Sequence, residues 1–105
     1  MSPKYKCSVV YTTLPSIEKA RELAGLAVKE QYVKCVNIIP QVTSIYEWQN
    51  EIEESSECIV LFKTTVEKED QLMAWLTQHH PYETPAILNI TADTPQSFWS
   101  YLNEK

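Results

Sequence analysis

The sequence holds two histidines, and they are adjacent. His79 and His80 open the run His-His-Pro-Tyr-Glu-Thr-Pro, which covers residues 79–85. Histidine is a common metal ligand, but neighbouring side chains of an extended segment point to opposite sides, so we do not expect both imidazoles to reach one ion. The H-x-x-x-H spacing of helical zinc sites is also absent. The alternative is that Pro81 fixes the backbone at His80, whose ring then forms local hydrogen bonds.

Five carboxylates crowd a short central stretch of the chain. They are Glu47, Glu51, Glu53, Glu54 and Glu57. Hard cations prefer clustered oxygen ligands, so the stretch is a candidate cation site. The more common role of such charges is to stop the edge of a hairpin from pairing with another chain.

A lysine and two threonines follow the most apolar segment, Cys58–Phe62. Lys63 precedes Thr64 and Thr65, either of which can cap a helix. A lysine beside the free backbone N–H groups of a helix N-terminus provides the elements of an anion site. The alternative is a capped helix beside a lysine whose stem lies on apolar surface.

Missing motifs exclude several classes of enzyme. The chain has one glycine, Gly25, and so lacks the glycine-rich loops of Walker and Rossmann phosphate sites. It also lacks the G-x-S-x-G nucleophile elbow, and no Ser-His-Asp or Cys-His arrangement has local support. We therefore expect a protein that is not an enzyme and has no organic cofactor.

Charge and cysteine content narrow the partners and the compartment. The chain has 14 Asp and Glu against 9 Lys and Arg, for a net charge of −5, which argues against nucleic acid or an anionic membrane as a partner. Cys7, Cys35 and Cys58 are odd in number and lack paired spacing, so neither a disulfide framework nor a structural zinc site is expected. No apolar run has the length of a signal peptide or membrane span, so the expected location is the cytoplasm.

The elements that must position these residues can be predicted from hydrophobic periodicity. The 105 residues are expected to form one domain, residues 1–105. Alternation predicts a strand over 5–14, and an apolar stripe from Ile17 to Val28 predicts a helix opened by Pro15 and Ser16. The remaining predicted elements are extended segments over 33–49 and 51–65, a helix with Val66, Leu72, Met73 and Leu76 on its buried face, a strand over 86–91, and a final helix capped by Thr94 with Pro95 at its first position.

The order β-α-β-β-α-β with a C-terminal helix predicts an α+β, ferredoxin-like fold. Right-handed crossovers build a four-stranded antiparallel sheet with both crossover helices on one face, which leaves the other face bare. The segment Cys58–Phe62 is apolar on both faces and is expected to be a central strand.

The central hairpin is too long for a lone domain of this size. Residues 35–49 span about 50 Å at ~3.3 Å each, whereas a compact chain of this length is roughly 35 Å across. An overhanging hairpin that carries exposed aromatic residues, like a bare sheet face, favours a partner, and a second copy of the chain is the expected one. The alternative is that Pro40 divides the segment into two ordinary strands.

Five blocks of sequence occur in a characteristic order. They are Cys-Val-Asn-Ile-Ile-Pro at 35–40, Val-Thr-Ser-Ile-Tyr-x-Trp at 42–48, Ile-Glu at 52–53, Lys-Thr-Thr at 63–65 and His-Pro-Tyr-Glu-Thr-Pro at 80–85. Together they resemble the CutA family, the small divalent-cation-tolerance proteins, over about residues 7–102. The resemblance implies a single CutA-like domain, a ferredoxin-like fold, a tight homotrimer whose hairpins pack around the threefold axis, and a link to copper tolerance and copper binding.

Two departures from the family pattern lie in the hairpin. Glycine usually stands where this chain has Gln41, and Gly-Lys where it has Asn50 and Glu51. Asparagine tolerates a left-handed turn, so Asn50 is a mild change. Loss of the lysine makes the hairpin more acidic.

Two further departures concern metal ligands. Some members carry a cysteine where this chain has Thr12, and glutamate often stands where it has Ala86. A family metal site made of cysteine, histidine and glutamate would keep only His80 here.

The resemblance implies a cytoplasmic homotrimer of the metal-response class that binds copper(II) weakly through His80 with Glu83. The alternative is a trimeric signalling or scaffold protein that resembles the nitrogen-regulatory P-II proteins in fold. Such a protein would bind a small anion or a protein partner in a cleft between subunits, lined by Lys63, Tyr82, Trp48 and Tyr46.

Overall fold

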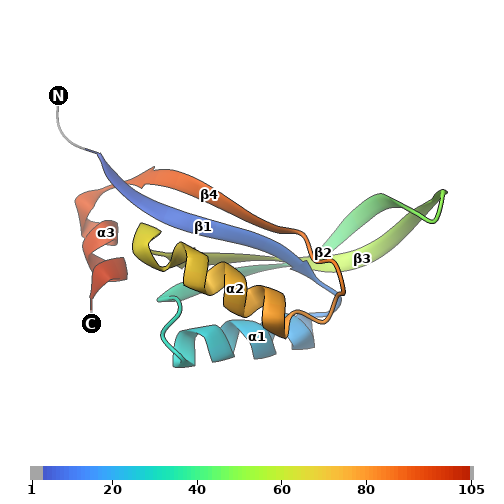
Figure 1. Ribbon diagram of the computed structural model, residues 1–105, viewed down its shortest axis with the longest axis horizontal. Helices are drawn as coiled ribbons and strands as arrows, with labels where there is room; N and C mark the ends of the chain where they lie inside the picture. The colour runs from blue at the N-terminus through green and yellow to red at the C-terminus, as the bar shows by residue number, and fades with distance from the viewer. Residues whose placement is uncertain (1–3, 105) are drawn as a thin grey trace.

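The computed structural model describes residues 4–104, which form a four-stranded antiparallel sheet and three α-helices (Figure 1). The elements in chain order are β1 (Tyr5–Leu14), α1 (Ile17–Lys29), β2 (Cys35–Trp48), β3 (Glu51–Thr64), the 3-10 helix η1 (Val66–Lys68), α2 (Glu69–His79), β4 (Ile87–Thr94) and α3 (Gln96–Asn103). The strand order β2-β3-β1-β4, with α1 and α2 as crossovers, confirms the predicted ferredoxin-like fold.

The core lies between the sheet and the two crossover helices, which Figure 1 shows on the same side of the strands. β1 and β3 are the inner strands, and their even-numbered side chains point toward the helices, so that Val10, Val60 and Phe62 are fully buried. Leu23 of α1 and Leu72 of α2 are among the helix side chains that belong to the same core. The predicted central strand is therefore confirmed, and its Phe62 is the largest fully buried side chain.

The opposite side of the sheet is called the open face below, and the prediction that it is entirely bare is wrong at one end. There α3 packs over the strands: the rings of Trp99 and Tyr5 lie 5.2 Å apart between centroids, and Cys7 is buried. The rest of the open face carries Val9, Tyr11, Ile59, Leu61, Leu88 and Ile90.

The helical segment after β3 starts at one of its two predicted caps. Thr64 lies in β3 and donates its hydroxyl hydrogen to Tyr32 O at 2.9 Å, so the cap is Thr65, whose Oγ1 accepts from Lys68 N at 3.2 Å. Val66 belongs to η1, which precedes α2, and therefore does not lie on the buried face of α2. It is exposed, whereas the prediction placed it among the buried residues of this helix. Trp75 is buried on α2 instead.

The last helix starts one position later than predicted. Thr94 still belongs to β4, where it pairs with Tyr5, and therefore does not cap α3. Pro95 occupies the N-cap position. Pairing with the first residues of β1 explains why β4 continues past the predicted end of the strand.

The β2–β3 hairpin overhangs the body, as predicted, and projects at the right of Figure 1. The molecule measures 49 × 32 × 22 Å, and its radius of gyration of 15.0 Å exceeds the roughly 13 Å of a compact chain this long. Pro40 does not divide β2. The strand instead contains a bulge between Ile39 and Val42, where Gln41 has φ 59°. The hairpin turn is Gln49-Asn50, with φ 51° and 66°.

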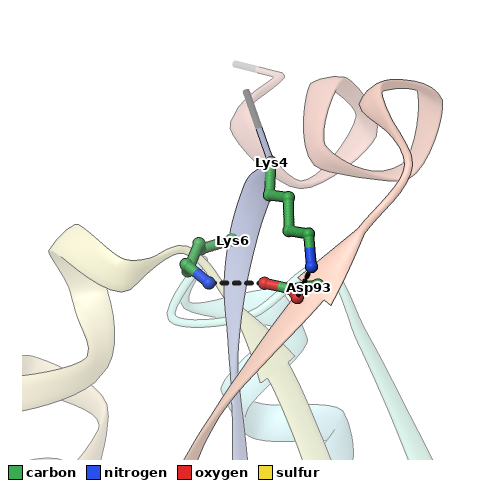
Figure 2. Close-up of polar contacts among 3 residues, drawn as sticks. All are labelled: Lys4, Lys6 and Asp93. Carbon is green, nitrogen blue, oxygen red and sulfur yellow. Dashed lines mark hydrogen bonds and ion pairs between the residues drawn. The ribbon is translucent and has the colours of Figure 1, made fainter. Parts of the chain in front are cut away.

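A small charged cluster joins the start of β1 to the end of β4 (Figure 2). The Nζ atoms of Lys6 and Lys4 lie 2.5 and 3.4 Å from the carboxylate oxygens of Asp93. Hydrogen bonds from Lys6 and then Lys4 lower the pKa of Asp93. All three side chains are largely exposed, so the ladder between the strands, and not this cluster, holds the sheet edge together.

Replacing Phe62 by alanine should lower the free energy of unfolding by about 3–5 kcal/mol, because the change leaves a cavity in a core that is fully buried. Urea denaturation at a fixed protein concentration measures the loss. Val28→Ala, at an exposed position of α1, is the control and should have little effect. Equal stability of Phe62→Ala and the wild type would contradict the packing described.

Replacing Gln41 by glycine should stabilise the protein by up to about 1 kcal/mol. A side chain held at positive φ costs roughly 1–2 kcal/mol, part of which glycine loses again in backbone entropy. Gln41→Ala keeps the β-carbon and should give no gain. Thermal unfolding of the two variants side by side tests this account, which fails if alanine stabilises as much as glycine.

Candidate functional site

His80 lies where the end of α2 meets the end of β1. It is the C-cap of α2, and its ring is buried. Nε2 lies 2.9 Å from Thr13 O and 3.0 Å from Thr12 Oγ1, and Tyr82 N donates to Nδ1 at 3.1 Å. A carbonyl oxygen only accepts, so Nε2 carries the hydrogen and Nδ1 is the acceptor. Both ring nitrogens are therefore engaged within the chain.

Burial lowers the pKa of His80, and the hydrogen bond to Thr13 O and the charge of Glu57 only partly oppose this effect. The imidazole is accordingly neutral at pH 7. Because the folded-state pKa lies below the unfolded value of about 6.5, acidification through that value favours the unfolded chain.

The positions at which the resemblance implies cysteine, histidine and glutamate come together around this ring. Besides contacting His80, Thr12 Oγ1 donates to Ala86 O at 2.7 Å. In this chain Thr12 and Ala86 stand in place of the cysteine and the glutamate. The hydroxyl of Thr12 therefore bonds to the carbonyl oxygen of Ala86 and to the ring of His80. The arrangement is closed by hydrogen bonds between neutral groups.

Glu83, the second predicted copper ligand, is exposed in the bend between α2 and β4. Within residues 4–104, no hydrogen bond or ion pair links it to His80, and no group of three or more His, Cys, Asp and Glu side chains forms a metal centre. His79 points elsewhere: it ends α2, and its ring stacks on Trp75 with centroids 4.6 Å apart. The expectation that the two imidazoles do not share one ion agrees with this placement, although the reason given, an extended segment at His79, is wrong.

Tyr82 connects His80 to the base of the hairpin. Its ring lies 5.0 Å from that of His80, and its hydroxyl donates to Glu57 Oε2 at 2.6 Å. The pKa of Tyr82 is raised well above its usual range. Burial is the largest cause, the hydrogen bond to Glu57 is the second, and the charges of Glu57, Tyr46 and Cys58 add smaller increases. Sequence reasoning named Tyr82 and Glu57 separately but missed their contact, because nothing local links residues so far apart in sequence.

Lys63 is not brought to the other residues of the predicted cleft within one chain. Its Nζ lies 6.0 Å from the ring of Phe98 in α3, at the end of the sheet away from the hairpin. Glu57, the partner of Tyr82, stands six positions earlier on the same strand, about 20 Å away at ~3.3 Å per residue. Tyr46 and Trp48 lie further out on the hairpin. A cleft that contains all four residues requires more than one copy of the chain.

The three cysteines are free; Cys7 and Cys58 are buried and Cys35 is partly exposed. No helix among residues 4–104 combines the length and apolar character needed to cross a membrane.

Comparison with known proteins identifies the family. The family model described as CutA1 divalent ion tolerance protein matches residues 8–105. A divalent-cation tolerance protein CutA of Yersinia pestis (strain Pestoides F) is 34% identical over 96 residues, which are 90% of this chain and 81% of that protein.

Solved structures agree. CutA1 from Ehrlichia chaffeensis superimposes with a TM-score of 0.90 at 32% identity, covering 97% of this chain and 95% of that chain. The divalent cation tolerance protein from Thermus thermophilus gives a TM-score of 0.84 at 38% identity and coverage of 91% and 94%. The CutA of Archaeoglobus fulgidus, described as periplasmic, gives 0.87 at 28% identity and coverage of 92% and 95%. With its fold, its length and nearly all of its residues matched, this chain belongs to the CutA family of divalent-cation tolerance proteins.

Proposed function

We propose that the protein acts in divalent-cation tolerance as a cytoplasmic homotrimer that responds to metal ions and binds copper(II) weakly. The family membership supports the tolerance role, and three free cysteines fit a reducing compartment. We also propose that the protein is not an enzyme and that neither nucleic acid nor a membrane is its partner. The P-II-like signalling alternative is not favoured by the comparisons, whose names are those of CutA proteins.

Exposed apolar side chains carry the proposal of an oligomer. On the open face Leu88 and Ile90 are about half exposed, and on the hairpin Trp48 and Ile52 are 60% and 82% exposed. Apolar patches of this kind on a small chain mark surfaces that meet a partner. A closed cyclic assembly of identical chains would cover the open face and the hairpin together.

The copper proposal rests on the one ring nitrogen of His80 that carries a lone pair. Nδ1 accepts the hydrogen bond of Tyr82 N, so a copper ion must displace this bond before it binds. Copper(II) leads the first-row divalent ions at nearly any nitrogen and oxygen site, so uptake alone does not establish a native ligand. Glu83, three positions later, is the proposed oxygen donor. The lost hydrogen bond and the absence of thiolate favour weak binding.

Static light scattering at micromolar concentration should give three times the chain mass of 12.2 kDa. Ile90→Glu, on the open face, should shift the protein toward smaller species because it buries a charge in the contact. Val28→Glu makes the same change at an exposed position of α1 and should leave the mass unaltered. A wild-type mass near that of one chain would refute the trimer.

Calorimetry should detect copper(II) binding with a Kd at or above about one micromolar, with nitrogen and oxygen donors and no thiolate in the electron paramagnetic resonance spectrum. His80→Ala should remove most of this binding, and Cys7→Ser should not change it. His79→Ala is the matched control, because His79 is exposed and its Nδ1 bonds to Trp75 O, while its Nε2 has no hydrogen bond within residues 4–104. Loss of binding in His79→Ala but not in His80→Ala would place the copper at His79 and reject His80 as its ligand.

A further inference from the structure

The net charge of the chain lies on its central hairpin. Residues 35–62 hold five glutamates and neither lysine nor arginine, whereas the other nine carboxylates match the nine Lys and Arg of the rest of the chain. The net charge of −5 is therefore the charge of this hairpin. Any surface that covers the hairpin must accommodate those carboxylates.

The strand register divides the projecting part of the hairpin into two faces. Directly opposed residues of an antiparallel pair point to the same side, so the pairs Tyr46–Glu53 and Trp48–Glu51 share one face. The aromatic–carboxylate face consists of Tyr46, Trp48, Glu51, Glu53 and Glu57, and the opposite face carries Ile45, Glu47, Ile52 and Glu54.

The aromatic–carboxylate face continues into the open face of the sheet. Along β3, Glu57, Ile59 and Leu61 alternate onto the same side, so the apolar surface proposed to meet other copies runs directly into the acidic one. Covering carboxylates without a counter-charge is costly. The contact is favourable only if the surface that covers this face supplies a cation.

Lys63 is the one cationic side chain on the open face of the four strands, within the part of the chain that the structure describes. Its Nζ lies over the Phe98 ring at 6.0 Å, and no described carboxylate forms an ion pair with it. Its charge is felt on that side of the sheet. Burial and the charge of Cys35 raise the pKa of Cys7, and the charge of Lys63 opposes part of this increase. Among residues 4–104, Lys63 is thus a cation without a charged partner.

The hairpin of the same chain cannot provide that partner. Glu53 precedes Lys63 by ten positions on one continuous strand, about 33 Å at ~3.3 Å per residue. In a head-to-tail ring, by contrast, a hairpin that extends beyond its own body can reach the next copy.

We propose that Lys63 of one copy docks onto the aromatic–carboxylate face of the neighbouring copy, with its ammonium against the rings of Tyr46 and Trp48 and paired with Glu53. A cation placed on aromatic rings and beside a carboxylate gains both attractions. The inference rests on the proposed trimer and names the contact that closes it. Each subunit supplies one lysine and receives one, so the ring is complete only when every copy takes part.

Charge reversal within one chain tests the pair, because each trimer then carries the reversed pair between copies. Lys63→Glu and Glu53→Lys should each raise the concentration at which half of the trimer dissociates, by about tenfold or more, measured by analytical ultracentrifugation. The double variant Lys63→Glu/Glu53→Lys should recover most of that loss. Circular dichroism checks that each chain is folded, and Lys63→Gln replaces Lys63→Glu if the latter is not.

The matched control uses the neighbouring glutamate on the other face of the hairpin. Glu54→Lys makes the same change in charge as Glu53→Lys but points away, so it should not rescue Lys63→Glu. Equal rescue by Glu54→Lys, or single variants that dissociate like the wild type, would overturn the pair while leaving the trimer in place. A monomeric wild type would instead refute the trimer itself, and the pair with it.

Discussion

The structure depends on β3, which extends beyond the end of its neighbour β1. The inner part of β3, from Ile59 to Lys63, pairs with both β1 and β2 and carries the centre of the core, whereas Glu51–Glu57 pairs with β2 alone. A two-stranded ribbon is at best marginally stable by itself. The hairpin beyond the body therefore derives its order from the firmly held inner half and from whatever covers its two faces. The three most exposed large apolar residues of the described chain (Ile45, Trp48 and Ile52), the concentrated charge and the bulge at Gln41 all lie on or beside this unsupported part.

His80 serves first as a structural joint. It ends α2, fixes the end of β1 through Thr12 and Thr13, and orients the backbone that leads to β4 through Tyr82 N. In this chain the joint is complete without a metal, because neutral groups satisfy every polar atom of the ring. Where related positions carry cysteine and glutamate, the same geometry would gather charged ligands. In this chain the three positions therefore converge without cysteine or glutamate.

The sequence predicted the parts of the fold that follow from local pattern and failed where a contact between distant segments decides. The strand over 5–14, the helix capped by Ser16 and the buried Phe62 follow from alternation, capping and apolar runs. Of the two predicted caps of the second helix, Thr65 is correct and Thr64 is not, and the cap at Thr94 was wrong; Thr64 and Thr94 both pair in strands, which no local signal reveals. The resemblance associated the positions of His80, Thr12 and Ala86 with one metal site, but the hydrogen bonds that unite them cross most of the chain. The contact of Tyr82 with Glu57 has the same origin.

The aromatic residues of the hairpin do not by themselves decide the charge of a ligand, but their neighbours do. Within one chain Tyr46 and Trp48 stand opposite glutamates, and the hydroxyl of Tyr82 is already donated to Glu57. An anion placed there meets three carboxylates and must displace a short hydrogen bond. A lysine from the next copy removes the repulsion, but the charge that neutralises a carboxylate is no longer available to hold a second anion. Binding of an anion in the cleft and docking onto the neighbouring copy therefore both require Lys63. The excess of carboxylates on the aromatic–carboxylate face favours the docking of Lys63 over the binding of an anion.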